Sequence, residues 1–412
     1  MTSITPLTSC RICGNTQLEL VLDLGEQALT GIFPRSPEAT VTTGPLRLLR
    51  CHGGREHCGL LQLAHTFDSG EMYGDQYGYR SGLNASMALH LAEKVSWLQS
   101  RRPLSAGDVV LDIGSNDGTT LGNYPAHVTR IGIDPTTEKF RQFHPPGIQA
   151  VAEFFSAAAF RQIAGTKKAS IVTSLSMFYD LPAPMEFVRD VAEILADDGV
   201  WHFEQSYLPL MLKTNSYDTV CHEHLEYYAL AQIEWMVTRC GLRITDVQFN
   251  DVNGGSFAVT VEKGVGHAAK VNELLAEEAW IASPETWANF RAMVERHRSE
   301  LRGLLTQLKD QGKRVYGLGA STKGNVVLQY CGITTELLEK IAEVNPDKFG
   351  SFTPGTGIPI CSEAEALSER PDIFMVLPWH FRKGILKNHQ PFIDAGGALL
   401  FPLPTIEFVP AL

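Results

Sequence analysis

The sequence predicts an α/β protein made of three successive domains. Two stretches, beginning near residues 108 and 314, alternate short apolar runs with helical periodicity, which is typical of a parallel sheet wrapped by helices. A shorter segment before them holds four of the eight cysteines within the first 58 residues. A chain of 412 residues is also longer than one hydrophobic core usually serves. We therefore expect domains at residues 1–68, 69–290 and 291–412.

The cysteines of the N-terminal segment are spaced to hold one metal ion. A C-x2-C knuckle lets two thiolates face a tetrahedral Zn²⁺, and a second cysteine pair can complete its coordination. Six residues separate that second pair, so His52 or His57 could replace one thiol. Free thiols in a small β-rich module are the alternative. Four protein ligands would leave no open position, so this zinc would be structural. The expected ligands are Cys10, Cys13, Cys51 and Cys58.

Local patterns predict the elements between the cysteines and the first α/β stretch. Apolar runs at 46–50 and 60–63 flank the second cysteine pair and predict strands of a small zinc ribbon that ends near Thr66. Residues 72–81 contain three tyrosines but too many glycines for a helix. Residues 87–95 have the three-and-four spacing of a helix, so a loop precedes a helix here.

The first α/β stretch contains a glycine turn placed to bind a ligand. Strands are predicted at 109–113, 131–134, 171–175 and 200–204, and ligands of such sheets bind at the carboxyl ends of the strands. Directly after the first strand, Gly114 and Gly118 allow the backbone to approach a ligand closely. Asp134, about 20 residues past the turn, stands where a carboxylate accepts hydrogen bonds from ribose hydroxyls. The spacing favours an adenosine-containing ligand.

The residues between these two glycines distinguish among nucleotide ligands. Ser115, Asn116 and Asp117 are polar, and the loop resembles the first motif of class I S-adenosylmethionine methyltransferases more than the Gly-x-Gly-x-x-Gly of nicotinamide enzymes. A nicotinamide oxidoreductase and a purely structural turn are the alternatives. The residues expected to bind S-adenosylmethionine are Asp112, Gly114, Ser115, Asn116, Asp117, Gly118 and Asp134.

A run of titratable residues at 222–228 predicts a proton-transfer site. A histidine with a pKa near neutrality can take a proton from a carbon next to a carbonyl, with Glu223 orienting its other ring nitrogen. The zinc motif H-E-x-x-H does not apply, because Glu226 stands where the second histidine is needed. The structural alternative is a buried polar cluster that ties a loop to the sheet.

The second α/β stretch carries its own glycine loop. Before it, the residues from Asn253 to Val261 predict a tight turn and a strand, and 278–309 predict a charged helical connector. The loop from Gly317 to Asn325 offers backbone N–H groups, a hydroxyl and an ammonium to an anion, without the spacing of a Walker P-loop. A simple strand-to-helix corner is the alternative. Residues 344–350 and 353–356 predict a further loop beside it.

Composition narrows the classes of partner. Lys and Arg number 35 against 46 Asp and Glu, so the formal charge is −11, and no basic block would follow a nucleic-acid backbone. The first residues lack the pattern of a signal peptide, and no segment supplies the roughly 18 apolar residues that span a bilayer. We expect a cytoplasmic protein that binds neither nucleic acid nor membrane.

Taken together in this order, the motifs resemble the sugar C-methyltransferases that act on nucleotide-activated 4-keto-deoxyhexoses. The likeness extends over nearly the whole chain. It implies an N-terminal zinc-binding domain, a central class I (Rossmann-like) methyltransferase domain, and a C-terminal Rossmann-like α/β domain that closes over the sugar nucleotide. The implied carrier is dTDP, with GDP and CDP as alternatives, and the oligomeric state stays open. The motifs behind the resemblance are Cys10/Cys13, 111–119, 222–224, 253–256, 317–325, 345–346 and 353–355.

The resemblance implies C-methylation of the sugar, at C3, in branched-sugar biosynthesis. His224 would be the base that forms an enolate, and Glu223, His222 and Tyr79 would complete the catalytic set. O- or N-methylation of a sugar or a small natural product is the alternative, and a non-catalytic zinc-bearing module that holds nucleotide sugars is another.

The resemblance also implies a set of substrate-side residues. These are Tyr77, Tyr79, Arg80, Ser81, Asn253, Ser321, Lys323, Asn325, Asn345, Lys348 and Thr353. Two features depart from the family pattern. Cys221 stands where family members have a tyrosine, and the interval from Cys51 to Cys58 is lengthened.

Overall fold

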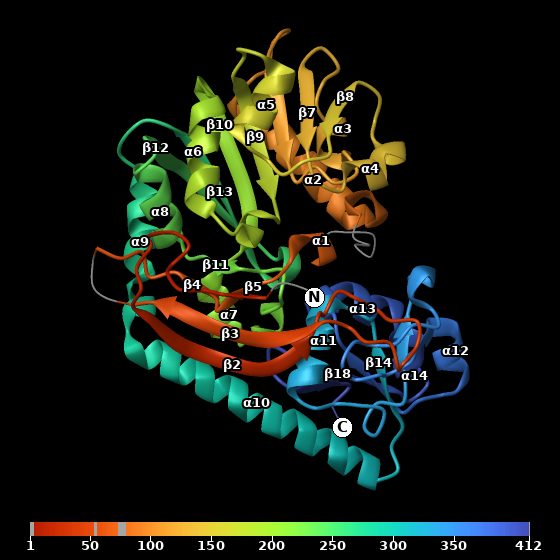
Figure 1. Ribbon diagram of the computed structural model, residues 1–412. Helices are drawn as coiled ribbons and strands as arrows, with labels where there is room; N and C mark the ends of the chain where they lie inside the picture. Colours follow the sequence, from red (N-terminus) through yellow and green to blue (C-terminus); the bar gives the residue numbers. More distant parts are fainter. Residues whose placement is uncertain (1–3, 53–55, 73–79, 412) are drawn as a thin grey trace.

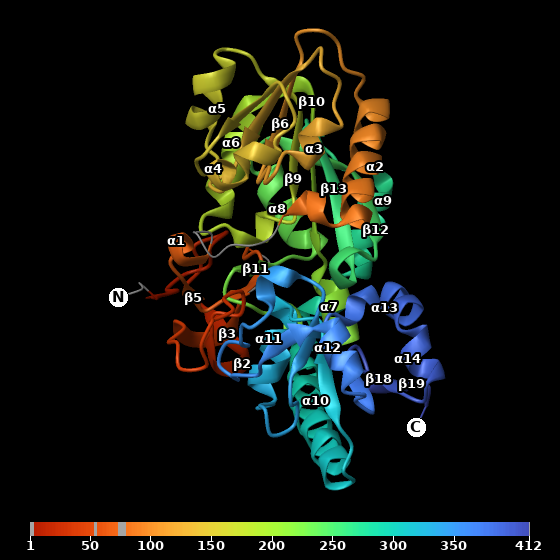
Figure 2. The same cartoon turned by 90° about the vertical axis from the view of Figure 1, so that its right-hand side faces the viewer.

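A computed structural model describes residues 4–52, 56–72 and 80–411 of the chain. The molecule has an upper lobe around one large sheet and a lower lobe around two smaller sheets that lie side by side (Figure 1). Turned by 90°, the molecule again shows two lobes, with strand β11 (Glu226–Tyr227) near their junction (Figure 2). The predicted α/β class is confirmed.

The upper lobe is a seven-stranded sheet with the order β12-β13-β10-β9-β6-β7-β8. Its strands are parallel except for β13, which pairs antiparallel with both of its neighbours. The strands are β6 (Val109–Ile113), β7 (Thr129–Ile133), β8 (Ile148–Val151), β9 (Ala169–Leu175), β10 (Leu195–Ser206), β12 (Leu242–Asn250) and β13 (Ser256–Lys263). The four strands predicted in this stretch are confirmed within one to a few residues.

Helices cover both faces of this sheet, and their ends follow capping rules. Asn84 accepts hydrogen bonds from the backbone N–H groups of Ser86 and Met87 and so begins α2, while Ser156 caps α5 in the same way. Because the helices bury both faces, β6 and β9 are almost entirely buried. The helices are α2 (Ala85–Arg101), α3 (Thr119–Gly122), α4 (Thr137–Phe140), α5 (Ala157–Ala164), α6 (Pro184–Ile194), α8 (Leu230–Thr238) and α9 (Ala269–Glu277).

The N-terminal part of the lower lobe is an antiparallel sheet that recruits a strand from the middle of the chain. Its order is β11-β4-β3-β2, with β2 (Leu18–Ala28), β3 (Thr43–Cys51) and β4 (Leu61–Leu63). A separate two-stranded ladder joins β1 (Thr5–Pro6) to β5 (His65–Thr66). Residues 226 and 227, which belong to the polar run at 222–228, thus pair with residues 62 and 61. This pairing holds the polar run against the N-terminal sheet.

The C-terminal part of the lower lobe is a six-stranded sheet with the order β16-β15-β14-β17-β18-β19. It is parallel apart from the β18–β19 pair. The elements are β14 (Val315–Leu318), α11 (Thr322–Tyr330), β15 (Ile341–Glu343), β16 (Ile360–Ser362), α12 (Glu363–Ser368), β17 (Ile373–Val376), α13 (Arg382–Asn388), α14 (Gln390–Asp394), β18 (Ala398–Phe401) and β19 (Glu407–Val409). The predicted strand, glycine loop and helix around Gly317 are confirmed.

The long helix α10 (Pro284–Asp310) is the predicted charged connector, and it runs beneath β2 and β3 (Figure 1). Its buried residues, among them Trp287 and Phe290, share one hydrophobic cluster with strands of both lower sheets. The lower lobe is therefore one packed body. The boundaries drawn from the sequence at residues 68/69 and 290/291 stay predictions.

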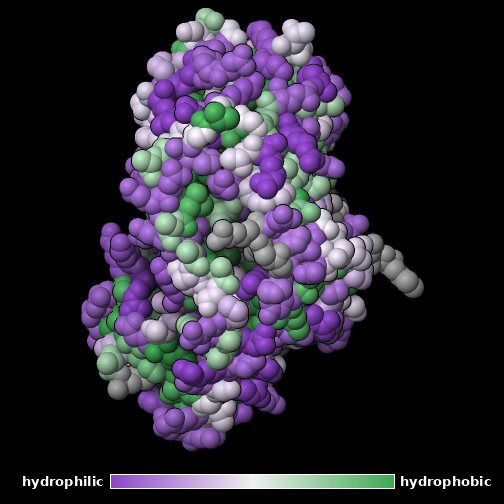
Figure 3. All heavy atoms as spheres, turned by 90° about the vertical axis from the view of Figure 1, so that its left-hand side faces the viewer, coloured by the Kyte–Doolittle hydropathy of each residue, from purple (hydrophilic) through white to green (hydrophobic). Residues whose placement is uncertain are grey.

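The surface in Figure 3 is mostly hydrophilic, with hydrophobic residues in small scattered groups. Within the described ranges, no helix combines the length and the apolar composition that crossing a membrane requires.

Candidate active site

A cavity of about 540 Å³ opens at the carboxyl ends of the upper strands. Such a volume lies within the usual range of small-molecule sites. Strand β6 contributes Asp112 to its lining, the turn after β6 contributes Gly114, Ser115 and Asn116, and Asp134 follows β7. Asp117 and Gly118, which were also predicted to bind the donor, do not line the cavity. Carboxylates beside an apolar wall suit a ligand that carries positive charge.

The turn after β6 has the backbone that the glycines predicted. Gly114 and Gly118 adopt φ angles of +72° and +77°, in the left-handed region that favours glycine. The backbone N–H of Asn116 donates to Asp134 Oδ2 at 2.8 Å. The other oxygen, Oδ1, accepts from the backbone N–H and the hydroxyl of Thr136, each at 2.6 Å. Asp134 thus holds the turn in place as well as facing the cavity.

Asp117 fastens the residues that precede α2 to this turn. Its Oδ2 accepts from the backbone N–H of Gly82 at 2.9 Å and lies 3.8 Å from Arg80 Nε. The backbone N–H of Ser81 donates to Asn116 Oδ1 at 3.0 Å. Arg80 and Ser81, which were predicted to contact the substrate, therefore contact the turn after β6, where the methyl donor is predicted to bind. Ser81 also lines the cavity. Tyr77 and Tyr79 lie outside the described residues.

The pKa of Asp112, which lines this cavity, is strongly shifted. Burial and the nearby charge of Asp134 raise its pKa to about 7, although a hydrogen bond from the Thr173 hydroxyl to Oδ1 at 2.5 Å opposes the shift. Near neutral pH this carboxyl can therefore be neutral or charged, and a bound cation would favour the charged form.

The polar run at 222–228 begins beside this cavity. Leu225 lines the cavity directly, and the His222 ring packs edge-on against Phe67, another lining residue, with ring centroids 4.6 Å apart. Several buried polar atoms of the run have no hydrogen-bond partner in the described chain, including the hydroxyls of Tyr227 and Tyr228. Such a concentration is typical of a site that water or a ligand completes.

His224 is held by a backbone carbonyl. Its Nδ1 lies 2.8 Å from the Thr219 carbonyl oxygen, and its ring packs edge-on to Tyr179 with centroids 4.4 Å apart. A carbonyl only accepts, so Nδ1 carries the hydrogen and Nε2 carries the lone pair. Burial, with a smaller effect of the Lys323 charge, lowers the pKa of His224 to about 4. The ring lines a small space of about 10 Å³ with Thr219 and Tyr179 rather than the large cavity.

The expected partnership between Glu223 and His224 is wrong in its geometry, because the Thr219 carbonyl takes the position assigned to the carboxylate. Glu223 instead faces Gly31, where an added Cβ would lie 2.8 Å from Glu223 Oε1. Burial raises the pKa of Glu223, and its hydrogen-bonding neighbour Cys221 has a thiol pKa raised well above the ordinary value by burial. Burial also lowers the pKa of His222 to about 4.

Lys323 brings the C-terminal glycine loop to the same region. Its Nζ donates to the Asn253 carbonyl oxygen at 2.7 Å, joining two predicted substrate-side residues that are 70 positions apart. Burial lowers the pKa of Lys323, while the charge of Asp218 raises it. Asp218 in turn accepts from Trp379 Nε1 at 2.7 Å. The positive charge of Lys323 therefore lies close enough to His224 to lower the pKa of that ring.

The other predicted substrate-side residues bond mainly to their own surroundings. Ser321 caps α11 through the backbone N–H of Gly324, and Asn325 Nδ2 donates to the Thr30 carbonyl at 2.7 Å. Lys348 Nζ donates to the Ala320 carbonyl at 2.7 Å, so it lies beside the loop. Asn345 caps the short helix Pro346–Lys348, and Thr353 accepts from the backbone N–H of Ile358 at 2.9 Å.

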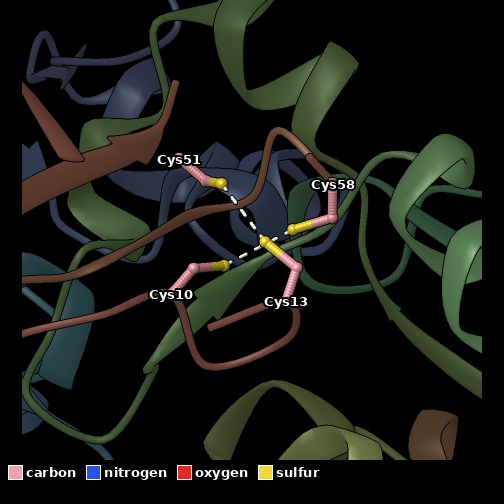
Figure 4. Close-up of side chains that lie close together, drawn as sticks. All are labelled: Cys10, Cys13, Cys51 and Cys58. Atoms are coloured by element: carbon pink, nitrogen blue, oxygen red, sulfur yellow. Dashed lines mark hydrogen bonds between the residues drawn. The ribbon is translucent and has the colours of Figure 1, made fainter. Parts of the chain in front are cut away.

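The four N-terminal cysteines converge as predicted, and their side chains point toward one another (Figure 4). The sulfurs of Cys10 and Cys58 are 3.4 Å apart and those of Cys13 and Cys51 are 3.5 Å apart. Four thiolates around Zn²⁺ at the usual bond length have edges of about 3.8 Å, so the donor set fits this ion. Cys51 and Cys58 therefore join the set, and neither His52 nor His57 is needed.

Sequence reasoning missed a carboxylate–imidazole pair in the large cavity. His90 on α2 and Glu204 near the end of β10 both line it, and His90 Nε2 lies 2.6 Å from Glu204 Oε1. Glu204 closes the predicted strand 200–204, so the rule that ligands bind at carboxyl ends could have identified it. No comparable signal marks His90, because its partner is 114 residues away.

Comparisons with known proteins match the three parts of this architecture. Family profiles described as "Putative zinc binding domain", "Methyltransferase domain" and "C-methyltransferase C-terminal domain" match residues 10–73, 86–247 and 251–404. The C-methyltransferase NovU of Streptomyces niveus is 30% identical over 417 residues, which cover 99% of this chain and 98% of NovU.

Solved structures resemble only part of the chain. A methyltransferase of Haloferax volcanii, solved with the activator Trm112, covers 44% of this chain and 95% of its own at 12% identity and a TM-score of 0.35. An S-adenosylmethionine-dependent methyltransferase of Clostridium acetobutylicum covers 43% and 92% at 14% identity and a TM-score of 0.34. Scores this low carry no argument, whereas the match to NovU extends over both whole chains. The protein belongs to the family of S-adenosylmethionine-dependent C-methyltransferases that includes NovU.

Proposed function

We propose that this C-methyltransferase acts on a nucleotide-activated 4-keto-deoxyhexose and methylates it at C3, in branched-sugar biosynthesis. The observation that carries the proposal is the state of His224. Its Nδ1 hydrogen is committed to the Thr219 carbonyl, and a pKa of about 4 keeps the ring neutral at pH 7. Nε2 therefore has a lone pair ready to take a proton.

The reaction that suits this base is C-methylation next to a ketone. S-adenosylmethionine supplies an electrophilic methyl group bound to a sulfonium. His224 Nε2 takes the C3 proton, and the electrons of the C–H bond move toward the C4 carbonyl to form an enolate. The C3–methyl bond forms as the sulfur–methyl bond breaks, and the sulfur keeps the electron pair. General base catalysis typically supplies about 10² to 10⁴ in rate.

A pKa of about 4 is low for a base that works near pH 7; burial is its main cause, and the charge of Lys323 adds to the effect. The positive charge of Lys323 contributes to the lowered pKa of His224. A substrate diphosphate paired with Lys323 would offset that charge and raise the basicity of His224 as the substrate binds. The proposal thus links an anionic carrier, dTDP first with GDP or CDP as alternatives, to activation of the base.

Roles for the remaining residues complete the proposal. Glu223, with a raised pKa, would exchange protons with the sugar oxygen, and His222 and Tyr79 would complete the catalytic group. The substrate-side residues would be those implied by the family resemblance, with Lys323 and Lys348 facing the diphosphate. The alternative is O- or N-methylation of a sugar or a small natural product, in which His224 would deprotonate a heteroatom.

The test compares His224→Asn with the parent protein and with His127→Asn, an exposed histidine outside both sites. We expect His224→Asn to lose at least about a hundredfold in turnover while it binds S-adenosylmethionine with parental affinity. Mass spectrometry follows the gain of one CH2 on a dTDP-4-keto sugar, and NMR locates the new carbon–carbon bond. Solvent deuterium should enter C3 with the parent protein alone. Parental turnover by His224→Asn would refute the assignment, and a methyl group on oxygen or nitrogen would establish the alternative.

A further inference from the structure

The His90–Glu204 pair belongs to a buried network that the proposed mechanism does not use. Glu204 is only 3% exposed, and its Oε1 accepts from His90 Nε2 at 2.6 Å. Its Oε2 lies 2.8 Å from Lys94 Nζ and accepts from Asn250 Nδ2 at 2.7 Å. Three donors from α2 and β12 therefore occupy both oxygens, and the carboxylate has little capacity left for a ligand.

The charges of this network determine which nitrogen of His90 can meet a ligand. Burial opposes ionisation of Glu204, but the hydrogen bond from His90 and the charge of Lys94 outweigh it and lower its pKa to about 2. An ionised carboxylate only accepts, so the His90 hydrogen is on Nε2. When the ring carries a single hydrogen, its place on Nε2 leaves the lone pair on Nδ1. In the described chain no protein group bonds to that Nδ1.

The strand order places this pair at the opposite end of the cavity from Asp134. Along the carboxyl edge the strands run β7, β6, β9, β10, so Asp134 and Glu204 are separated by three strand intervals, or about 14 Å at the usual spacing. A donor ribose at Asp134, as predicted, would leave the end of the cavity near β9 and β10 for the methionine part of the donor and for the methyl acceptor, and we call this the reacting end. His90 lines the cavity and bonds to Glu204 of β10 at that end.

We propose that His90 Nδ1 accepts a hydrogen bond from a ligand at this reacting end, and that Glu204 is the positioning residue that holds the ring. The ligand group is an N–H or O–H donor. The cavity offers two sources of it, the α-ammonium of S-adenosylmethionine and a hydroxyl of the methyl acceptor. This inference rests on the donor cavity and not on the identity of the base, so it stands or falls separately from the role of His224.

Two substitutions separate this role from a purely structural one. The Nε2 of a glutamine lies near the position of His Nε2, so His90→Gln keeps a donor for Glu204 and loses the acceptor at Nδ1. The side chain of asparagine ends near the position of Nδ1, so His90→Asn keeps an acceptor there and loses the bond to Glu204. The matched control is Leu89→Gln, which changes a residue that is 61% exposed on the same helix.

Isothermal titration calorimetry with S-adenosylmethionine gives the Kd of the methyl donor. Initial rates with the sugar that the parent protein methylates give the KM of the methyl acceptor. If the ammonium is the partner, His90→Gln weakens the donor Kd by about tenfold to a hundredfold, and His90→Asn largely restores it. If a hydroxyl is the partner, the donor Kd is unchanged and the acceptor KM rises by about threefold to tenfold in His90→Gln.

A structural role predicts the reverse order, with His90→Gln parental and His90→Asn impaired. That result, or values within twofold of the parent for both constants in His90→Gln, would overturn the proposal. If the parent protein does not methylate a 4-keto sugar, the proposed function is wrong, but this result does not bear on His90. The titration with S-adenosylmethionine then decides the role of His90.

Discussion

Arg11 connects the cysteine knuckle to the polar run at 222–228, and its removal gives the sharpest test of how that run is held against the N-terminal sheet. The residue stands between the zinc ligands Cys10 and Cys13. Its guanidinium donates to the carbonyls of Leu63 and His65 at 2.7 and 3.2 Å and to the Thr66 hydroxyl at 2.9 Å. Its Nε also lies 3.6 Å from Glu226 Oε1, with side chains that are 2% and 0% exposed.

The expected cost of Arg11→Met follows from these contacts. Three hydrogen bonds contribute about 1 kcal/mol each, or about 3 kcal/mol in all. Burial raises the pKa of Glu226 well above its ordinary value, so its carboxyl can become neutral once the cation is gone, which limits any further cost. A loss of about 3 kcal/mol should raise the equilibrium for local opening of β4 and β11 by roughly a hundredfold.

Hydrogen–deuterium exchange of peptides that contain residues 61–66 and 225–227 measures this opening. Arg47→Met is the matched control on the same sheet, because the Arg47 side chain is 40% exposed and its 2.9 Å contact with Asp23 is a surface pair worth about 0–1 kcal/mol. Zinc content should be parental in both variants. Exchange in Arg11→Met as slow as in the parent, or equal acceleration in Arg47→Met, would refute the reasoning.

Two further predictions concern the metal and pH. Cys13→Ser should lower the zinc content measured by metal analysis and speed hydrogen–deuterium exchange of the amides of residues 10–64, because a structural zinc stabilises only the folded site. Stoichiometric zinc with exchange as slow as in the parent would contradict this prediction. Burial lowers the pKa of several histidines, to about 3 in His202 and His380 and to about 4 in His222 and His224. Below their unfolded pKa near 6.5 the unfolded chain binds more protons, so stability present above that pH should fall between about pH 6.5 and pH 4, by about 1.4 kcal/mol per pH unit for each histidine. Thermal melts across this range should show a steep loss in the parent and a shallower one in His202→Gln, and equal slopes would count against the account.

Elements whose signal lies within a few neighbouring residues could be predicted from the sequence. The turn after β6 needed only an apolar strand followed by Gly114 and Gly118, which reach left-handed angles that other residues rarely adopt. The same holds for the strand, glycine loop and capped helix around Ser321. Four cysteines in two pairs predicted a convergent metal site, since few other arrangements use reduced thiols at that spacing.

Contacts between distant segments were decided by packing. In each case the residues next to a group in the sequence reveal nothing about its partner in space. Such contacts are the pairing of β11 with β4 and the hydrogen bonds of His224 with the Thr219 carbonyl, of His90 with Glu204 and of Lys323 with Asn253. The sequence by itself therefore determined the α/β class, the donor turn and the metal ligands, because backbone conformation and local spacing are properties of short segments. Only the tertiary structure decided which ring nitrogen of His90 and of His224 is bonded to the protein, because that depends on the acceptor that the fold brings to the ring.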